Sequence, residues 1–306
     1  MKIHSSFERE AGRPLVLAIG FFDGVHLGHR ELIRRTLLAR KPGWRAGAIT
    51  FSNHPSAYLR PGQEPALIQS CEERINTLAR LGIEECFLLP FDREIASLSA
   101  QRFIDEVLVE KLAARAVITG TTFRFGERRS GDVTLLRERL AIVGAAHVGV
   151  EAVCDERDKQ RISSTRIREL IAAGDCERAD ALLGASYELR GVVVRGFGRG
   201  HDLGFPTANL RLERKLLPRD GVYAAVVRTD GRDFAALLSI GTNPQFGAGE
   251  RSIEVWLRDF QGSLYGEQLA VRELRFVRPQ KTFSDVASLM EQMEHDREAV
   301  AYPSYG

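Results

Sequence analysis

Residues 18–29 read Ala18-Ile19-Gly20-Phe21-Phe22-Asp23-Gly24-Val25-His26-Leu27-Gly28-His29 and join a predicted strand to a predicted helix. The apolar run over residues 14–19 is typical of a buried strand, and a helical pattern follows from about residue 27 to residue 39. A glycine-containing turn before a helix attracts phosphate, because unpaired backbone N–H groups and the helix dipole point at it. His26 and His29 could donate hydrogen bonds to a phosphoryl group there. A buried helix start with satisfied histidines is the structural alternative.

The first half of the chain alternates apolar runs with helical patterns. Strands are predicted at residues 15–19, 46–51, 86–89, 116–119 and 146–153, and helices at residues 30–40, 71–81, 100–111 and 131–140. This alternation predicts a parallel sheet with helices on both faces. Ligands of such sheets bind beyond the carboxyl ends of the strands, where the histidine-containing turn would lie.

The pattern changes after two further predicted helices, at residues 164–173 and 176–183. Consecutive strands are predicted at residues 187–195, 221–229, 235–240, 251–257 and 268–276, and one helix at residues 284–301. Strands without intervening helices predict an antiparallel barrel or sandwich. We therefore expect two domains, residues 1–184 and residues 185–306.

Composition excludes several classes of protein. The length of 306 residues favours two domains, and 44% hydrophobic and 27% charged residues are typical of a globular protein. A net charge of +2 gives no support for a nucleic-acid or membrane partner. The four cysteines lack metal-ligand spacing, and no apolar run approaches a membrane span. We expect a cytoplasmic protein with reduced thiols; the sequence leaves its oligomeric state open.

Three further segments of the first half carry groups suited to a nucleotide. Residues 162–168 read Ile-Ser-Ser-Thr-Arg-Ile-Arg at a predicted helix start, where hydroxyls can cap the helix and arginines can bind phosphate oxygens. Residues 50–55 and 120–126 follow predicted strands, and the second of these brackets Arg124 with two phenylalanines that could stack on a planar ring. Neither a P-loop nor a dinucleotide-binding glycine motif is present in the sequence.

A glycine-rich segment of the second half ends in two oxygen-bearing side chains. Residues 196–209 read Gly-Phe-Gly-Arg-Gly-His-Asp-Leu-Gly-Phe-Pro-Thr-Ala-Asn. A long turn would explain the glycines and the proline. Thr207 and Asn209 lie two residues apart on an extended segment, and their oxygens could coordinate Mg²⁺ and a nucleotide phosphate.

Together, in this order and spacing, these segments resemble the bacterial bifunctional riboflavin kinase/FAD synthetase family. The motifs that carry the resemblance are residues 20–29, Phe51-x-x-His54-Pro55, Phe123-Arg124-Phe125-Gly126, residues 162–168 and Gly204-Phe205-Pro206-Thr207-Ala208-Asn209. The resemblance implies a Rossmann-like nucleotidyltransferase domain with a parallel sheet, followed by an antiparallel β-barrel kinase domain with a C-terminal helix.

For the first domain, the resemblance implies adenylyl transfer from ATP to FMN, which forms FAD and releases pyrophosphate. His26 and His29 would stabilise the transition state by positioning and charge neutralisation. The implied ATP-binding residues are Gly20, Phe22, Asp23, Gly24, Ser163, Ser164, Thr165 and Arg166. The implied flavin-binding residues are Asn53, His54, Pro55, Thr122, Phe123 and Arg124.

For the second domain, the resemblance implies phosphorylation of riboflavin by a second ATP with Mg²⁺ held by Thr207 and Asn209. Glu254 would be the general base, since an ionised carboxylate can accept the proton of the attacking hydroxyl; a solvated strand residue is the alternative. The implied ATP-binding residues are Gly196, Gly198, Gly204, Phe205, Pro206, Thr207 and Asn209.

Two other functions stay open from the sequence. Asn53, Thr122, His201 and Gln245 differ from the residues usual in this family, so both folds could be present with only one activity. A flavin- or nucleotide-binding regulator without turnover is the other alternative. The combination of His26, His29, Thr207, Asn209 and Glu254 favours an enzyme, because binding alone would not need all five.

Overall fold

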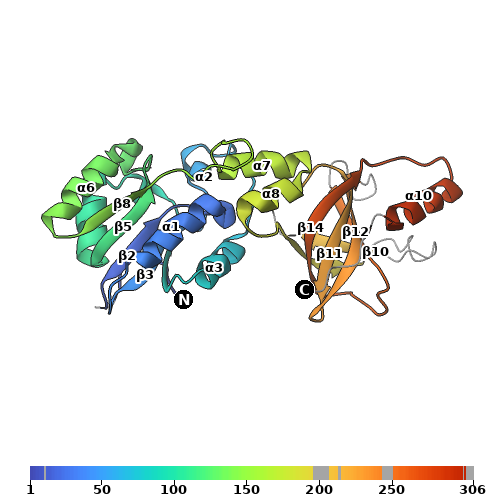
Figure 1. The fold of residues 1–306 in the computed structure, drawn as a ribbon, viewed down its shortest axis with the longest axis horizontal. Helices are drawn as coiled ribbons and strands as arrows, with labels where there is room; N and C mark the ends of the chain where they lie inside the picture. The colour runs from blue at the N-terminus through green and yellow to red at the C-terminus, as the bar shows by residue number, and fades with distance from the viewer. Residues whose placement is uncertain (10–11, 196–206, 213–214, 243–250, 299, 301–306) are drawn as a thin grey trace. The chain divides into compact units, whose positions relative to one another are not determined.

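The computed structural model describes residues 1–9, 12–195, 207–212, 215–242, 251–298 and 300. The chain divides into two compact units, Met1–Ser164 and Thr165–Gly306 (Figure 1).

The first unit is built on a six-stranded sheet in which every neighbouring pair of strands is parallel. Its strands, in chain order, are β1 (Lys2–His4), β2 (Leu15–Ile19), β3 (Arg45–Phe51), β4 (Glu85–Leu89), β5 (Ala114–Gly120) and β8 (Ala146–Val150). The spatial order is β1-β4-β3-β2-β5-β8. The predicted parallel α/β fold is therefore confirmed, and β1 is an edge strand that the sequence patterns did not predict.

Helices cover both faces of this sheet. They are α1 (Leu27–Leu38), α2 (Pro55–Leu59), α3 (Cys71–Arg80), α4 (Arg93–Ala96), α5 (Ala100–Arg102), the π-helix η2 (Phe103–Lys111) and α6 (Val133–Ile142). Short 3₁₀ turns η1 (Asp23–Val25) and η3 (Glu127–Arg129) and a small ribbon of β6 (Arg124–Phe125) and β7 (Gly131–Asp132) complete the unit.

The central strand β2 shows why the sheet is covered on both sides. Leu15 and Leu17 pack against apolar residues of η2 and α6, whereas Ala18 packs against residues of α1 and α3. Successive side chains of a strand point to opposite faces, so an unbroken apolar run requires helices on both. All five residues of β2 are buried.

Two predicted helices of this unit differ from the structure. Residues 100–111 were expected as one α-helix, but only three residues are α-helical before the chain widens into η2. The helix expected from residue 131 begins at Val133 instead, because Asp132 lies in β7 and its carboxylate accepts hydrogen bonds from Thr134 N and Leu135 N. An extended N-cap residue of this kind ends a strand and starts a helix.

The second unit contains a closed barrel whose neighbouring strands are all antiparallel, in the order β10-β13-β12-β11-β14-β9. Its elements are α7 (Ser164–Ala173), α8 (Cys176–Leu183), β9 (Leu189–Val194), β10 (Thr207–Leu212), β11 (Gly221–Thr229), β12 (Arg232–Thr242), β13 (Arg251–Leu257), β14 (Gln268–Arg278) and α10 (Val286–Glu298). The predicted antiparallel barrel and C-terminal helix are confirmed.

Helix α8 belongs to the same compact unit as the barrel. It contacts β14, and a side chain at Gly174, just before it, would meet Arg219 and the hydroxyl of Tyr223. The compact units accordingly divide between Ser164 and Thr165. A functional boundary after residue 184 stays a prediction.

Candidate active sites

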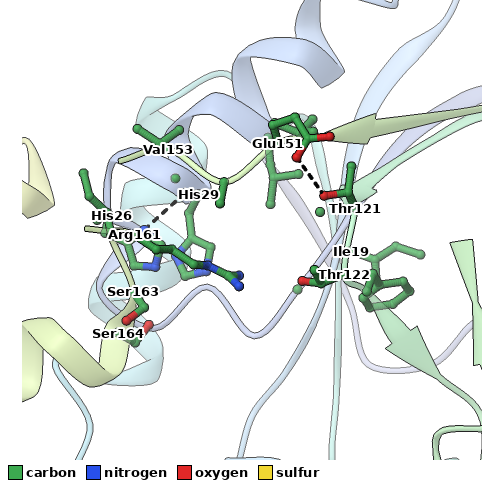
Figure 2. Close-up of a pocket in the computed structure, with 18 residues that line it drawn as sticks. Ile19, His26, His29, Thr121, Thr122, Glu151, Val153, Arg161, Ser163 and Ser164 are labelled. Carbon is green, nitrogen blue, oxygen red and sulfur yellow. Dashed lines mark hydrogen bonds between the residues drawn. The ribbon is translucent and has the colours of Figure 1, made fainter. Parts of the chain in front are cut away.

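A cavity of about 320 Å³ opens at the carboxyl edge of the parallel sheet (Figure 2). Residues at the ends of β2, β5 and β8 line it together with the start of α1 and residues 161–164. Strand β2 lies between β3 and β5, and the chain runs outward from it in both directions. The cavity therefore occupies the point where the strand order reverses, which is the usual ligand site of open α/β sheets.

The loop between β2 and α1 has an unusual backbone. Phe22 (φ 58°) and Val25 (φ 38°) lie in the left-handed region, as does Gly24 (φ 80°). This conformation is uncommon for a β-branched residue and persists only where the surroundings impose it. Here the buried carboxylate of Asp23 accepts hydrogen bonds from Ile68 N (3.0 Å) and Gln69 N (3.2 Å).

This backbone constraint bears on the predicted ATP-binding residues of the loop. Asp23 is 1% exposed and Phe22 is fully buried, so their side chains shape the loop from within. The hydroxyl of Ser164 donates to the carbonyl oxygen of Asp23 at 2.9 Å and ties residue 164 to the same loop. Gly20 lines the cavity. Contacts of these residues with ATP stay predictions.

His26 and His29 form one stacked pair at the N-terminus of α1. Their ring centroids are 3.7 Å apart at an interplanar angle of 19°, and His26 is the N-cap of the helix. Its Nδ1 accepts a hydrogen bond from the backbone N of His29 at 3.4 Å. An Nδ1 that accepts carries no proton, so a proton of the His26 ring is on Nε2, from which it can donate.

His29 is held in its neutral form. Burial lowers its pKa well below the usual 6.5, and the charges of His26, Arg74 and Arg161 act in the same direction. Its Nδ1 is buried and has no hydrogen-bond partner among the described residues. A neutral His29 stacked on His26 at a phosphate site can act as a hydrogen-bond donor.

Gly28 lies between the two histidines in the sequence and leaves room for their stacking. A Cβ at this position would be 3.1 Å from Cε1 and 3.2 Å from Nδ1 of His26. Any side chain at residue 28 would therefore push the ring of His26 away from its capping position.

Cationic and hydroxyl groups gather on one side of the cavity, where Figure 2 shows Arg161, Ser163 and Ser164 near the two histidines. Arg161 was missed by the sequence reasoning, although its place directly before the Ile-Ser-Ser-Thr motif was a usable signal. Thr165 and Arg166 lie in the second compact unit. Their roles at this cavity stay predictions.

The opposite side of the cavity carries Thr121, Thr122 and Glu151 (Figure 2). Thr121 Oγ1 donates to Glu151 Oε2 at 3.2 Å. Thr121 belongs to the segment 120–126 noted in the sequence but was given no role of its own. Glu151 was not predicted, because no motif joins residues that follow two different strands, β5 and β8.

The predicted flavin-binding residues are divided between two places. Thr122 and Phe123 line the cavity, while Arg124, at the start of β6, pairs with Asp132 at 3.1 Å. Asn53 and His54 have structural partners instead. The side-chain amide of Asn53 donates to Phe91 O (3.1 Å) and accepts from Phe91 N (2.7 Å).

His54 is the N-cap of α2, where its Nδ1 accepts from Ser56 N at 3.1 Å, and Pro55 is the first residue of that helix. The sequence Phe-x-x-His-Pro therefore has a structural role, because it starts helix α2. Asn53, His54 and Pro55 are not among the residues that line the cavity, and their flavin contacts stay predictions.

A second cluster lies on the barrel, between β10 and β13. Asn209 is directly opposite Glu254, and Thr207 Oγ1 donates to Glu254 Oε2 at 3.4 Å. Ile253 and Val255 are buried in the barrel, so Glu254 between them is on the outer face of β13. Ser239 of β12 is the neighbour of Glu254 on its other side, and the sequence gave no signal for it.

This cluster brings together a hydroxyl, an amide and a carboxylate, which are the oxygen donors that Mg²⁺ prefers. The remaining predicted ATP-binding residues of the kinase lie outside the described residues: Gly196, Gly198, Gly204, Phe205 and Pro206. His201 and Gln245, which differ from the residues usual in the family, also lie outside them.

The fold and the two clusters define a class of protein: a two-unit, nucleotide-using transferase with a paired-histidine site on an α/β unit and an oxygen-donor site on a β-barrel. The FAD synthetase family model matches residues 8–166, and the riboflavin kinase family model matches residues 183–302. The chain belongs to the bifunctional riboflavin kinase/FMN adenylyltransferase family.

Two relatives illustrate the match. The bifunctional riboflavin kinase/FMN adenylyltransferase of Listeria monocytogenes is 36% identical over 292 residues, which cover 92% of this chain and 90% of the relative. The enzyme of the same name from Bacillus subtilis is 35% identical over 301 residues, which cover 96% and 94%.

A crystal structure described as a macrolide-efflux protein from Streptococcus pneumoniae has the same fold over the full length of both chains. Its TM-score is 0.88 and its sequence identity is 32%.

In the part of this chain that the structure describes, no helix combines the length and the apolar character needed to cross a membrane.

Proposed function

We propose that this chain catalyses two consecutive reactions of flavin cofactor synthesis. The barrel phosphorylates riboflavin with ATP to give FMN, and the α/β unit transfers the adenylyl group of a second ATP to FMN, giving FAD and pyrophosphate. The observation that carries the proposal is the presence of both clusters in one chain: the stacked His26–His29 pair and the Thr207–Glu254 hydrogen bond.

In the adenylyl transfer, the phosphate of FMN attacks the α-phosphorus of ATP. His26 Nε2 and His29 donate hydrogen bonds to the phosphoryl oxygens as charge builds up in the transition state. Gly20, Phe22, Asp23, Gly24, Ser163, Ser164, Thr165 and Arg166 bind or shape the site for ATP, and Arg161 joins them. Asn53, His54, Pro55, Thr122, Phe123 and Arg124 frame the flavin.

In the kinase reaction, Glu254 takes the proton from the terminal ribityl hydroxyl as that oxygen attacks the γ-phosphorus of ATP. Gly196, Gly198, Gly204, Phe205, Pro206, Thr207 and Asn209 bind this ATP. Thr207 and Asn209 are the residues that would hold Mg²⁺, which shields the phosphate charge. The hydroxyl of Thr207 also keeps Glu254 oriented through their hydrogen bond.

We place the protein in the cytoplasm. Its four cysteines are free thiols, and two of them, Cys86 and Cys176, are buried. Free thiols are typical of a reducing compartment.

The test separates the two activities in the full-length chain. Wild-type protein is incubated with riboflavin, ATP and Mg²⁺, and flavins are resolved by chromatography. We expect FMN and FAD. His29→Ala should lower FAD formation about 100-fold or more while FMN still forms, because one transition-state donor is lost. Glu254→Gln should stop FMN formation but leave FAD formation from supplied FMN.

Other outcomes would assign a different function. FMN without FAD would mean that only the kinase is active, and FAD only from supplied FMN would mean that only the adenylyltransferase is active. Flavin binding without any product would identify a regulator. Loss of both activities in His29→Ala would contradict two independent sites.

A further inference from the structure

A buried arginine lies next to the histidine pair and has no place in the reaction described so far. Arg74 is on the first turns of α3, a helix whose start is fixed by a capping box between Ser70 and Glu73. Its side chain is fully buried, with 0% exposure. Arginine is almost never fully buried unless it is paired.

The partners of Arg74 are few for a buried guanidinium. Nη2 donates to the carbonyl oxygen of Phe51 at the end of β3 and lies 3.7 Å from Cys71 Sγ. The guanidinium carbon is 4.3 Å from the centre of the Phe21 ring, a cation–π contact. Nε and Nη1 are buried and have no hydrogen-bond partner among the described residues.

Burying the Arg74 guanidinium in this way costs folding free energy unless its positive charge makes favourable interactions. Burying a guanidinium with unpaired N–H groups removes their hydration without replacing it. Residues held at such a cost cluster at functional sites. The cost therefore points to a role of the charge itself.

Three neighbours of Arg74 belong to the proposed adenylyl-transfer site: Phe21, Asp23 and His29. Phe21 follows Gly20 in the catalytic loop, and its ring meets His54 edge-on at 4.7 Å. The carboxylate of Asp23 is close enough to act on the charge of Arg74. The guanidinium in turn acts on His29.

We propose that Arg74 is a positioning residue for adenylyl transfer: its buried guanidinium fixes Phe21 and the catalytic loop and keeps a permanent positive charge behind the His26–His29 pair. This role rests on the proposed FMN adenylyltransferase function, which it deepens. Arg74 does not touch the substrate itself but acts through Phe21 and His29.

The charge has a defined electrostatic effect on His29. A second positive charge near Arg74 is unfavourable, so the guanidinium opposes protonation of His29, as do His26 from the same loop and Arg161 from the segment before α7. Burial is the largest cause of the lowered pKa, and these three groups add to it. A neutral His29 can stay stacked on His26 while that ring caps α1.

The test measures the histidine directly. Protein labelled with ¹³C at histidine Cε1 is titrated by NMR, and the His29 signal is assigned from its absence in His29→Gln. In wild type the pKa of His29 should lie below 6.5. In Arg74→Met it should rise, since a nearby like charge is removed.

Activity provides a second readout with matched variants. In Arg74→Met, FAD formation from supplied FMN should fall about tenfold or more, mainly in kcat, and the acid limb of its pH profile should move to higher pH. Arg74→Lys keeps the charge and should retain the wild-type pH profile. Phe21→Leu removes the ring and should lower kcat without changing the His29 titration.

The control is Arg80→Met, which removes an exposed arginine from the same helix and should leave both readouts unchanged. If Arg74→Met and Arg74→Lys have the same His29 titration as wild type, the proposal is overturned and Arg74 is only structural. Absence of FAD formation in wild type would instead overturn the proposed function, since the titration does not depend on turnover. Dispersion of the amide signals of the α/β unit in the same NMR samples checks that this unit is folded in each variant, and FMN formation checks the barrel unit.

Discussion

At the scale of single residues, His26 has two roles that depend on each other. Its Nδ1 caps α1 by accepting from the backbone N of His29, and its Nε2–H is the donor that we propose for the adenylyl-transfer site. An N-cap side chain bonds the backbone N–H two or three positions later. The spacing of the two histidines therefore follows from capping geometry, and it also places the second ring against the first.

Gly28→Ala tests this geometry. The new methyl group would lie 3.1 Å from His26 Cε1, so the ring must move by a few tenths of an ångström and weaken the cap. We expect kcat for FAD formation from FMN to fall about tenfold, because a misplaced donor stabilises the transition state less. FMN formation by the same protein is the control. An unchanged rate of FAD formation would show that the position of the His26 ring is not critical.

At the scale of elements, the C-terminal helix depends on a buried ion pair. Arg278 at the end of β14 donates to both carboxylate oxygens of Asp296 on α10, and the side chains are 13% and 4% exposed. Gln292 adds a hydrogen bond to Asp296 at 2.9 Å. Such a pair determines where the helix packs, because removal of one partner leaves a buried charge uncompensated.

Asp296→Ala should therefore lower the free energy of unfolding of the barrel unit by about 3 kcal/mol. Urea unfolding can be followed through Trp256 of β13 in a Trp44→Phe background. Glu294→Ala removes an exposed carboxylate from the same helix, which pairs with Arg297 at 3.2 Å, and should change the stability by less than about 1 kcal/mol. Equal effects of the two substitutions would contradict this role of the ion pair.

The helix η2 illustrates a limit of element prediction. The apolar pattern of residues 100–111 predicts a helix, and a helix is present. Its π geometry, with Leu112 N donating to Val107 O at 3.0 Å, is not visible in the sequence, because an apolar pattern predicts a helix but not which backbone hydrogen bonds the helix forms. Apolar residues of η2 pack on Leu15 and Leu17 of the sheet.

At the scale of the whole molecule, each compact unit carries its own candidate site, so we expect the two activities to be separable by substitution.

Asp180 gives the stability of the barrel unit its own pH dependence. Burial raises the pKa of this carboxyl from 3.8 to about 6, with Glu273 and Glu177 acting in the same direction. Hydrogen bonds from Tyr187 N and Ser186 Oγ oppose this shift.

The sign of the effect follows from proton linkage. Because the folded state binds this proton more tightly than the unfolded state, its stabilisation is complete below pH 3.8 and is lost as the pH rises to about 6. Partial solvent exposure reduces the effect to about 1–2 kcal/mol.

Asp180→Asn should flatten the pH dependence of barrel unfolding between pH 4 and pH 6, measured by urea titration at several pH values. Glu177→Gln, an exposed change on the same helix, should preserve most of the slope. A slope unaffected by Asp180→Asn would show that other groups cause it.

The sequence alone determined the two folds and the family, because hydrophobic periodicity and short motifs are local properties. It also predicted catalytic roles for His26, His29 and Glu254, which lie within such motifs, and these roles stay predictions. Only the tertiary structure decided which distant residues meet. Ser164 bonds to Asp23, 141 residues away, and Asn53 bonds to Phe91, 38 residues away.

The same reason explains the residues that were missed. Arg161, Glu151 and Arg74 reach the carboxyl edge of the parallel sheet from three different segments. The sheet order β1-β4-β3-β2-β5-β8 sets which loops become neighbours. That order results from packing the apolar faces of all the strands at once, and no single segment contains it.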